Sequence, residues 1–270
     1  VQTVADTALA SDLNGGANGE DIEALLATNG LSDLLVEKTA TIGEKLSVRR
    51  FAKVTGDVVT SYIHGGGRIG VIIAANGATD DAAKEAITNI AMQVAAMNPQ
   101  YISRNDISDE ELAKLREITV DSALNDATTL PKPILNKLID KAINEKLWSD
   151  DDINNFNEHK NNMNYVWNFL SDAAKAKLGE LAMADKESIV AEKMFNGLVE
   201  GRVSKQLKEI CLLDQTYVKA EDGKQSVAKY LESVSKDLTI TEMVRFEVGE
   251  GMEKKQEDFA AEVAAQMAGV

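Results

Sequence analysis

The feature that most constrains the fold is a change of hydrophobic period along the chain. Short segments rich in β-branched residues predict strands over residues 48–54, 58–64 and 68–76. From Ser108 to about Ile210, the apolar residues recur at helical spacing instead, with almost no strand pattern. The chain is therefore expected to be an α+β protein, in which a long helical, coiled-coil-like arm is inserted into a core of antiparallel sheets and helices.

Start and stop signals place helices on both sides of the predicted strands. Helical spacing predicts helices over residues 21–27 and 31–46. A further helix is expected over residues 80–97, capped by Thr79 and ended by Asn98-Pro99. The arm should then begin at Ser108, which opens a capping box.

Strand character is expected to return after the arm. Residues 211–213 and 216–218 are β-prone, and residues 226–236 are amphipathic. Residues 239–248 alternate as a strand does, and the expected inward positions are Ile240, Val244, Phe246 and Val248. A last helix over residues 254–268 would place three apolar side chains on one face, namely Phe259, Val263 and Met267.

Glycines between His64 and Gly70 resemble two functional motifs. Gly65, Gly67 and Gly70 have the spacing of a dinucleotide-binding fingerprint, but that fingerprint must open a helix, and a β-branched run follows here. A His-Gly-Gly-Gly string also resembles the oxyanion loop of esterases, which requires a Gly-x-Ser-x-Gly elbow that this sequence lacks. The preferred interpretation is a β-hairpin whose glycines adopt positive φ at the turn.

Charge and residue inventory argue against several classes of function. The sequence has 44 Asp and Glu against 29 Lys and Arg, a net charge of −15, so its surface should repel nucleic acid and anionic lipid. Cys211, His64 and His159 are too few and too far apart for a zinc site. No apolar run is long enough to cross a bilayer. We therefore expect a cytoplasmic protein with no cofactor, no metal, no membrane and no direct nucleic-acid partner.

Six ordered blocks of sequence resemble elongation factor Ts. They are Val48-Arg49-Arg50-Phe51, Ser61-Tyr62-Ile63-His64-Gly65 with Arg68-Ile69-Gly70-Val71, Met92-Gln93-Val94-Ala95-Ala96, Val199-Glu200-Gly201-Arg202, Arg245-Phe246-Glu247-Val248-Gly249-Glu250-Gly251 and Asp258-Phe259-Ala260-Ala261-Glu262-Val263. The resemblance implies a guanine-nucleotide exchange factor that binds the GTPase elongation factor Tu. Such a factor promotes GDP release by stabilising the nucleotide-free GTPase, and it is not an enzyme with a substrate of its own.

The resemblance also implies a domain plan with a two-subdomain core. Residues 1–56 would be the remainder of the first core subdomain, and residues 57–107 with 211–249 would form the second. Residues 108–210 would be the inserted arm, and residues 250–270 a C-terminal helical module. The chain is expected to lack the family's N-terminal part, including a Thr-Asp-Phe-Val motif that acts beside the magnesium site of the GTPase.

Four residues match partner-binding positions of the family. Ile42 matches an apolar contact toward the switch region of the GTPase, although its periodicity also fits core packing. His64 matches a histidine at the hairpin tip that faces the third domain of the GTPase, although a lone histidine there also fits an ordinary surface residue. Val218 and Lys219 match an apolar pair that reaches the same domain, and Lys219 departs from the expected methionine.

Alternatives to efficient exchange stay open. The arm is longer than the resemblance predicts, so it is either a lineage-specific extension or a surface for a homodimer or another partner. The chain could therefore be an interaction module that binds the GTPase without efficient exchange, because the Thr-Asp-Phe-Val segment is absent. Hydrolysis at His64 is disfavoured by the missing elbow.

Overall fold

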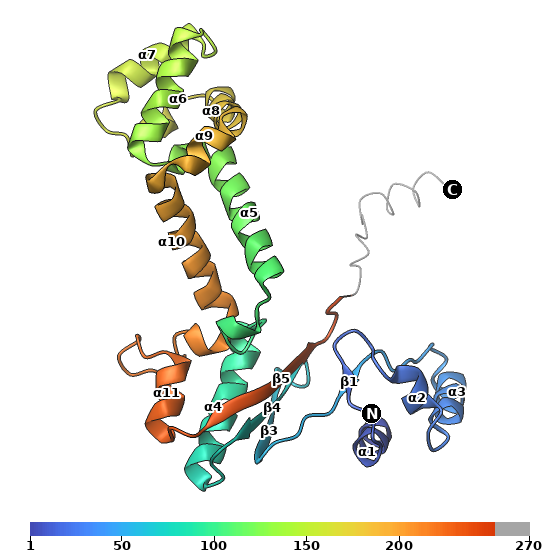
Figure 1. The fold of residues 1–270 in the computed structure, drawn as a ribbon. Coiled ribbons are helices and arrows are strands. Elements are labelled where there is room, and N and C mark those ends of the chain that lie inside the picture. Colours follow the sequence, from blue (N-terminus) through green and yellow to red (C-terminus); the bar gives the residue numbers. More distant parts are fainter. Residues whose placement is uncertain (252–270) are drawn as a thin grey trace, which may run out of the picture. The chain divides into compact units, whose positions relative to one another are not determined.

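The computed structural model describes residues 1–251, which divide into two compact units. Residues 1–98 and the described residues from 229 onward form the first unit, and residues 99–228 form the second. Helices and antiparallel sheets occur together, which confirms the α+β class (Figure 1). The helix expected over residues 254–268 lies outside the described residues.

A three-stranded antiparallel sheet is the centre of the first unit. Its order is β3 (Val58–His64), β4 (Ile69–Asn76) and β5 (Thr239–Glu247), so a strand from beyond the arm completes the sheet (Figure 1). Helix α4 (Asp81–Met97) packs against β3 and β4 and buries an apolar stripe. Its N-cap is Asp80 and not the expected Thr79, because the Asp80 carboxylate accepts a hydrogen bond of 2.8 Å from the Ala83 amide.

A bulge in the sheet overturns part of the prediction for β5. The register shifts between Ala74 and Ala75, so that Ile240 is paired with Ala75 while Val244 is paired with Ile72. Neighbouring residues of β4 point to opposite faces, and Ile240 and Val244 therefore face opposite ways despite their even spacing. Ile240 is buried, whereas Val248 follows the strand and is exposed, so the expectation of four inward positions was wrong.

The N-terminal segment, residues 1–54, forms a separate small cluster within the first unit. Its elements are α1 (Gln2–Ala10), β1 (Gly15–Gly16), α2 (Ile22–Leu26), α3 (Leu31–Ile42) and β2 (Phe51–Ala52). Their shared core consists of Ala8, Leu25, Leu31 and Phe51. The strand predicted over residues 48–54 is reduced to the two residues of β2, because its partner β1 is only two glycines long.

The second unit contains the predicted helical arm. Its helices are α5 (Asp109–Asn125), α6 (Lys132–Asn144), α7 (Asp150–His159), α8 (Asp172–Ala184), α9 (Lys186–Ala191) and α10 (Lys193–Ile210). The long helices α5 and α10 run side by side, and the shorter helices gather at one end of this pair (Figure 1). The predicted capping box at Ser108 is confirmed, since its hydroxyl accepts from the Glu111 amide while Glu111 reaches back to the Ser108 amide.

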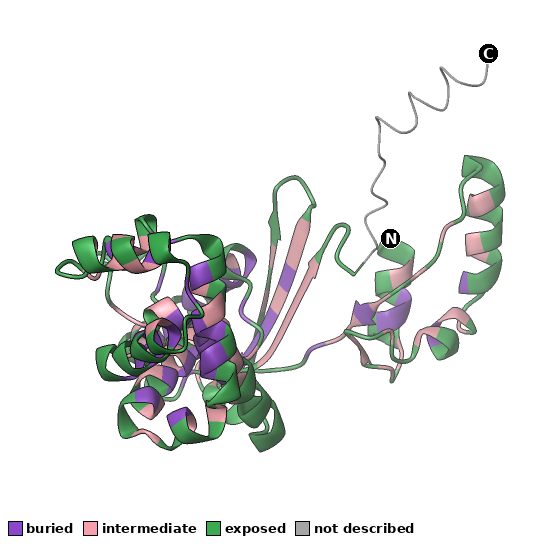
Figure 2. Cartoon of the chain, turned by 90° about the horizontal axis from the view of Figure 1, so that it is seen from above, coloured by how far each residue is buried: buried purple, intermediate pink, exposed green. Residues whose placement is uncertain are grey.

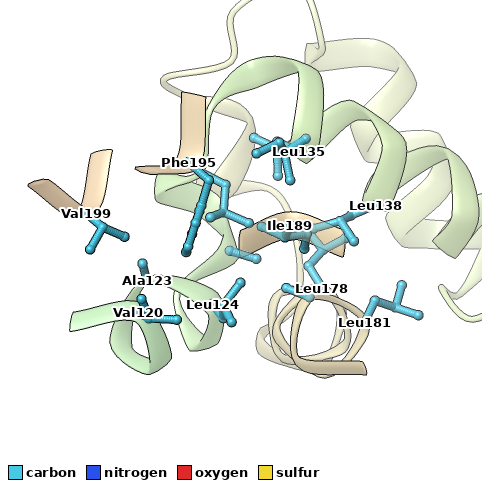
Figure 3. Close-up of a cluster of buried hydrophobic side chains, with 14 of the residues drawn as sticks. Val120, Ala123, Leu124, Leu135, Leu138, Leu178, Leu181, Ile189, Phe195 and Val199 are labelled. Atoms are coloured by element: carbon cyan, nitrogen blue, oxygen red, sulfur yellow. The ribbon is translucent and has the colours of Figure 1, made fainter. Parts of the chain in front are cut away.

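One continuous apolar core lies between the helices of the arm. Side chains from α5, α6, α8, α9 and α10 converge on it, with Phe195 among them and fully buried (Figure 3). Trp148 is buried in the same core, and its indole N–H donates a hydrogen bond of 3.0 Å to the Ala174 carbonyl. The arm therefore has a complete hydrophobic interior of its own.

The strands expected directly after the arm do not form. Leu212–Asp214 is a 3-10 helix, and only an isolated bridge joins Cys211 to Tyr101. A second isolated bridge joins Thr216 to Ser226, and helix α11 (Val227–Val234) follows. The short β-prone runs lack a neighbouring strand long enough to pair with, so local propensity alone predicted them wrongly.

Candidate functional site

The tip of the β3–β4 hairpin presents His64 to solvent. The register pairs His64 with Ile69, and Gly65, Gly66 and Gly67 all have positive φ, which confirms the predicted glycine turn. The Arg68 amide donates a hydrogen bond of 3.1 Å to the His64 carbonyl and closes the turn. The hairpin loop is exposed (Figure 2), so a partner could reach the imidazole without moving the backbone.

Tyr62 fixes the orientation of the His64 ring. The two side chains lie on the same face of β3, and the phenol oxygen lies 3.0 Å from Nδ1 of the imidazole. Their ring centroids are 5.8 Å apart. Tyr62 is half-buried while His64 is exposed, so the arrangement leaves the other ring nitrogen, Nε2, as the accessible polar atom.

Ile42 occupies the last position of α3. Its side chain is 57% exposed, so the alternative that this residue packs in the core does not hold. Gly43 ends the helix in the left-handed conformation, with φ of 79°, and its amide donates to the Thr39 carbonyl. Ile42 is therefore an exposed apolar side chain at the end of a regular helix.

Val218 and Lys219 lie in a turn and not in a strand. The Ala220 amide donates a hydrogen bond of 3.0 Å to the Tyr217 carbonyl, which places both residues at the centre of the turn. Tyr217 is buried beneath the turn, whereas the Val218 side chain is 49% exposed. The structure therefore brings this pair together on the surface of the second unit, while Ile42 and His64 lie on separate elements of the first.

A surface groove in the first unit was not anticipated from the sequence. It has a volume of about 790 Å³ and lies between α1, the segment around residues 46–54, and the two strands β4 and β5. The residues that line it are mostly apolar: Val1, Val4, Ala5, Ala8, Leu9, Leu35, Leu46, Ser47, Val48, Arg49, Arg50, Phe51, Ala52, Lys53, Val54, Ile72, Phe246, Glu247 and Gly249. No sequence pattern pointed to the groove, because it joins segments that are far apart along the chain, such as residues 46–54 and Phe246.

The groove carries positive charge in an otherwise acidic chain. The Arg50 guanidinium lies 4.6 Å from the centre of the Phe246 ring and forms an ion pair of 3.0 Å with Glu250. Arg49 donates to the backbone carbonyl of Glu250, and Lys53 donates to the carbonyls of Leu9 and Ser11. The two arginine contacts hold the chain after β5 against the edge of the groove, whereas the lysine contacts hold the end of α1.

Two further classes of site are absent from the part of the chain that the structure describes. Within residues 1–251, no three His, Cys, Asp or Glu side chains gather in a way that could hold a metal ion. Among the same residues, no helix is both long enough and apolar enough to cross a membrane.

Comparison with known proteins identifies the family. The family described as "Elongation factor TS" matches residues 1–250. A relative named elongation factor Ts from Clostridioides difficile strain 630 is 36% identical over 276 aligned residues, which cover 99% of this chain and 69% of the relative. Elongation factor Ts of Clostridium perfringens strain ATCC 13124 is also 36% identical, with 94% of this chain and 67% of the relative covered. The chain therefore belongs to the elongation factor Ts family of translation elongation factors.

Proposed function

We propose that this chain binds elongation factor Tu and promotes release of GDP from it, acting in the cytoplasm and without turning over a substrate of its own. Membership of the elongation factor Ts family supports this proposal. The observation that carries it is the exposure of Ile42, since an isoleucine at the end of α3 gains nothing there until a partner covers it.

Exchange requires thermodynamic linkage between two ligands of the GTPase. A factor that binds the nucleotide-free form more tightly than the GDP-bound form must weaken GDP binding by the same factor. One set of contacts has to hold the GTPase, and another has to favour its empty conformation. We assign the holding role to His64 and to the turn at Val218 and Lys219, and the second role to Ile42.

The roles predict different kinetic effects for two substitutions. In a stopped-flow measurement of fluorescent GDP release, Ile42→Ala should lower the maximal release rate by about tenfold, because it removes apolar contact made in the empty form. Val36→Ala is the matched control, since Val36 is on the same helix and is 70% exposed, and it should leave the rate unchanged.

The second substitution should change affinity instead of rate. His64→Ala should raise the concentration that gives half-maximal release by about fivefold, with the maximal rate nearly unchanged. Ser61→Ala on the exposed part of the same strand is its control. A chain that forms a complex with elongation factor Tu but does not accelerate GDP release would support the alternative of a binding module without efficient exchange.

A second candidate function concerns self-association through the arm. Ile118 on α5 and Met194 on α10 are large apolar side chains exposed on the two long helices. We infer that they form a contact between two copies of the chain. Sedimentation equilibrium should then show a dimer that Ile118→Glu dissociates and that Ala113→Glu, at an exposed position on another face of the same helix, leaves intact. A wild-type monomer would refute this candidate.

A further inference from the structure

Both histidines of the chain have a ring nitrogen beside a polar group, and the two polar groups differ in kind. Nδ1 of His159 lies 2.9 Å from the backbone carbonyl oxygen of Asn155, which can only accept a hydrogen bond. Nδ1 of His159 therefore carries a proton. Nδ1 of His64 lies 3.0 Å from the Tyr62 hydroxyl, which can donate or accept. The tautomer of His64 consequently depends on the role of that hydroxyl.

Basicity makes the Tyr62 hydroxyl the donor of this pair. Among the residues that the structure describes, Nδ1 of His64 is the one hydrogen-bond partner of the hydroxyl. An imidazole nitrogen is a base that takes up a proton near neutral pH, whereas a phenol oxygen is not, so the nitrogen is the stronger acceptor. A hydroxyl that donates to Nδ1 leaves the proton of a neutral imidazole on Nε2.

The surroundings of the pair hold both rings in place. Tyr62 is half-buried and is paired with Val71 in the sheet, and Val71 is 3% exposed. His64 follows two residues later on the same face of β3, and the two ring planes meet at 39°. The Arg68 amide donates to the His64 carbonyl and fixes the backbone there. The backbone and Nδ1 of His64 are therefore both held, while Nε2 has no hydrogen-bond partner among the described residues.

We propose that Tyr62 is a positioning residue, whose hydroxyl keeps the His64 proton on Nε2 and directs that N–H toward an acceptor oxygen of the bound GTPase. The effect on binding rests on the proposed function, in which His64 contacts elongation factor Tu, whereas the tautomer is a property of the free chain. An imidazole that is already oriented loses less side-chain freedom on binding, which increases affinity. It also disfavours a partner surface that presents a donor, because two N–H groups would then face each other.

Nitrogen NMR of the free chain tests the tautomer. In a sample labelled with nitrogen-15 histidine at about pH 8.5, where an imidazole is neutral, Nε2 of His64 should resonate in the range of a protonated nitrogen. Tyr62→Phe retains the ring and removes the hydroxyl, so the Nε2 signal should move toward the unprotonated range as the two tautomers mix. Because the sequence has two histidines, His64→Ala assigns the signals, and those of His159 should not move.

Two results of the NMR experiment would overturn the proposal. A wild-type spectrum with the proton on Nδ1 of His64 would mean that the Tyr62 hydroxyl accepts. An Nε2 signal that stays unchanged in Tyr62→Phe would mean that the hydroxyl does not set the tautomer. Tyr165→Phe is the matched control: it removes a phenol hydroxyl from a residue that is 62% exposed in the arm, and it should leave the His64 signals unchanged.

A double-mutant cycle determines whether Tyr62 acts through His64. The affinity for nucleotide-free elongation factor Tu, measured by titration calorimetry, should fall about twofold to threefold in Tyr62→Phe. The same substitution in a His64→Ala background should have no further effect. An equal loss in both backgrounds would overturn the proposal, because Tyr62 would then act without His64. Wild-type affinity in His64→Ala would refute the proposed contact of His64 and, with it, the binding role of Tyr62; the NMR experiment still decides the tautomer.

Discussion

The helical arm and the N-terminal segment bury their apolar residues in different ways. The arm has one continuous core that draws on five helices, with Phe195 fully buried within it (Figure 3). The N-terminal segment shares a core of four residues and leaves an apolar groove and Ile42 at its surface. The arm therefore has a much larger apolar core than the N-terminal segment, and burial should stabilise the arm more.

The largest expected effect is a truncation in the core of the arm. Phe195→Ala should lower the free energy of unfolding of the arm by about 3–5 kcal/mol, because the side chain is fully buried and packed helices collapse little around the cavity. Urea denaturation followed by circular dichroism measures it. Lys193→Ala, at an exposed position at the start of the same helix, should cost under about 0.5 kcal/mol.

The matching truncation in the N-terminal segment should cost less and stay local. Leu25→Ala should cost about 2–3 kcal/mol, since a core of four residues can relax around the lost atoms. Amide exchange should accelerate over residues 1–54 and remain unchanged in the arm. Faster exchange in both regions would show that they unfold together, which would contradict the contrast drawn here.

A carboxylate joins two helix ends inside the arm and makes its stability depend on pH. Asp152 is buried, which alone would raise its pKa, but hydrogen bonds from the Ser149 hydroxyl and from the amide and hydroxyl of Ser171 outweigh burial and lower the pKa. Ser149 and Ser171 are the N-caps of α7 and α8, so the carboxylate connects these helices.

Replacing Asp152 by a neutral residue should lower the free energy of unfolding of the arm only above the pKa that the Asp152 carboxyl has in the folded protein. Because the folded pKa is lowered, the stabilisation is fully present above the unfolded value near 3.9 and is lost as pH falls through the folded pKa. Asp152→Asn should therefore cost about 2 kcal/mol at pH 7 and progressively less in acid. A cost that stays constant down to pH 2 would contradict this account, and measurements on Asp151→Asn provide the control.

Alanine substitutions at two helical glycines should give the smallest changes in the stability of the arm, and the two changes should have opposite signs. A Cβ at Gly179 would lie 2.7 Å from the Asn125 carbonyl oxygen, so Gly179→Ala should destabilise the arm by about 1–2 kcal/mol. No atom lies within 4 Å of a Cβ at Gly197, so Gly197→Ala on α10 should stabilise it by about 1 kcal/mol through helix propensity. Thermal denaturation of both variants measures the difference.

Patterns within one element could be predicted from the sequence, whereas features that join distant segments could not. The β3–β4 hairpin with His64 at its tip and the capping box at Ser108 depend on neighbouring residues, and both predictions are confirmed. The groove depends on Phe246 meeting residues around Val48, and the β5 bulge depends on pairing with Ala74 and Ala75. The hydrophobic period of one segment gives no information on contacts between segments that are far apart in the sequence.

The same limit applies to the candidate partner-binding residues. The sequence located Val218 near a strand, but a bend closed by Tyr217 and Ala220 exposes it instead. In the sequence, Ile42 fits the apolar period of α3. Only the structure shows that the helix ends there, before Gly43, and that Ile42 is exposed. Their roles toward the GTPase remain predictions that the kinetic variants can test.

The burial of Trp148 determines which events an optical probe can detect. The sequence has two tryptophans, Trp148 and Trp167, and both belong to the arm. Intrinsic tryptophan fluorescence therefore reports the unfolding of the arm, and it does not report the unfolding of residues 1–98, which contain no tryptophan. A single sharp fluorescence transition would say nothing of the surface that carries Ile42 and His64, and a tryptophan introduced at Phe51 would supply the missing signal.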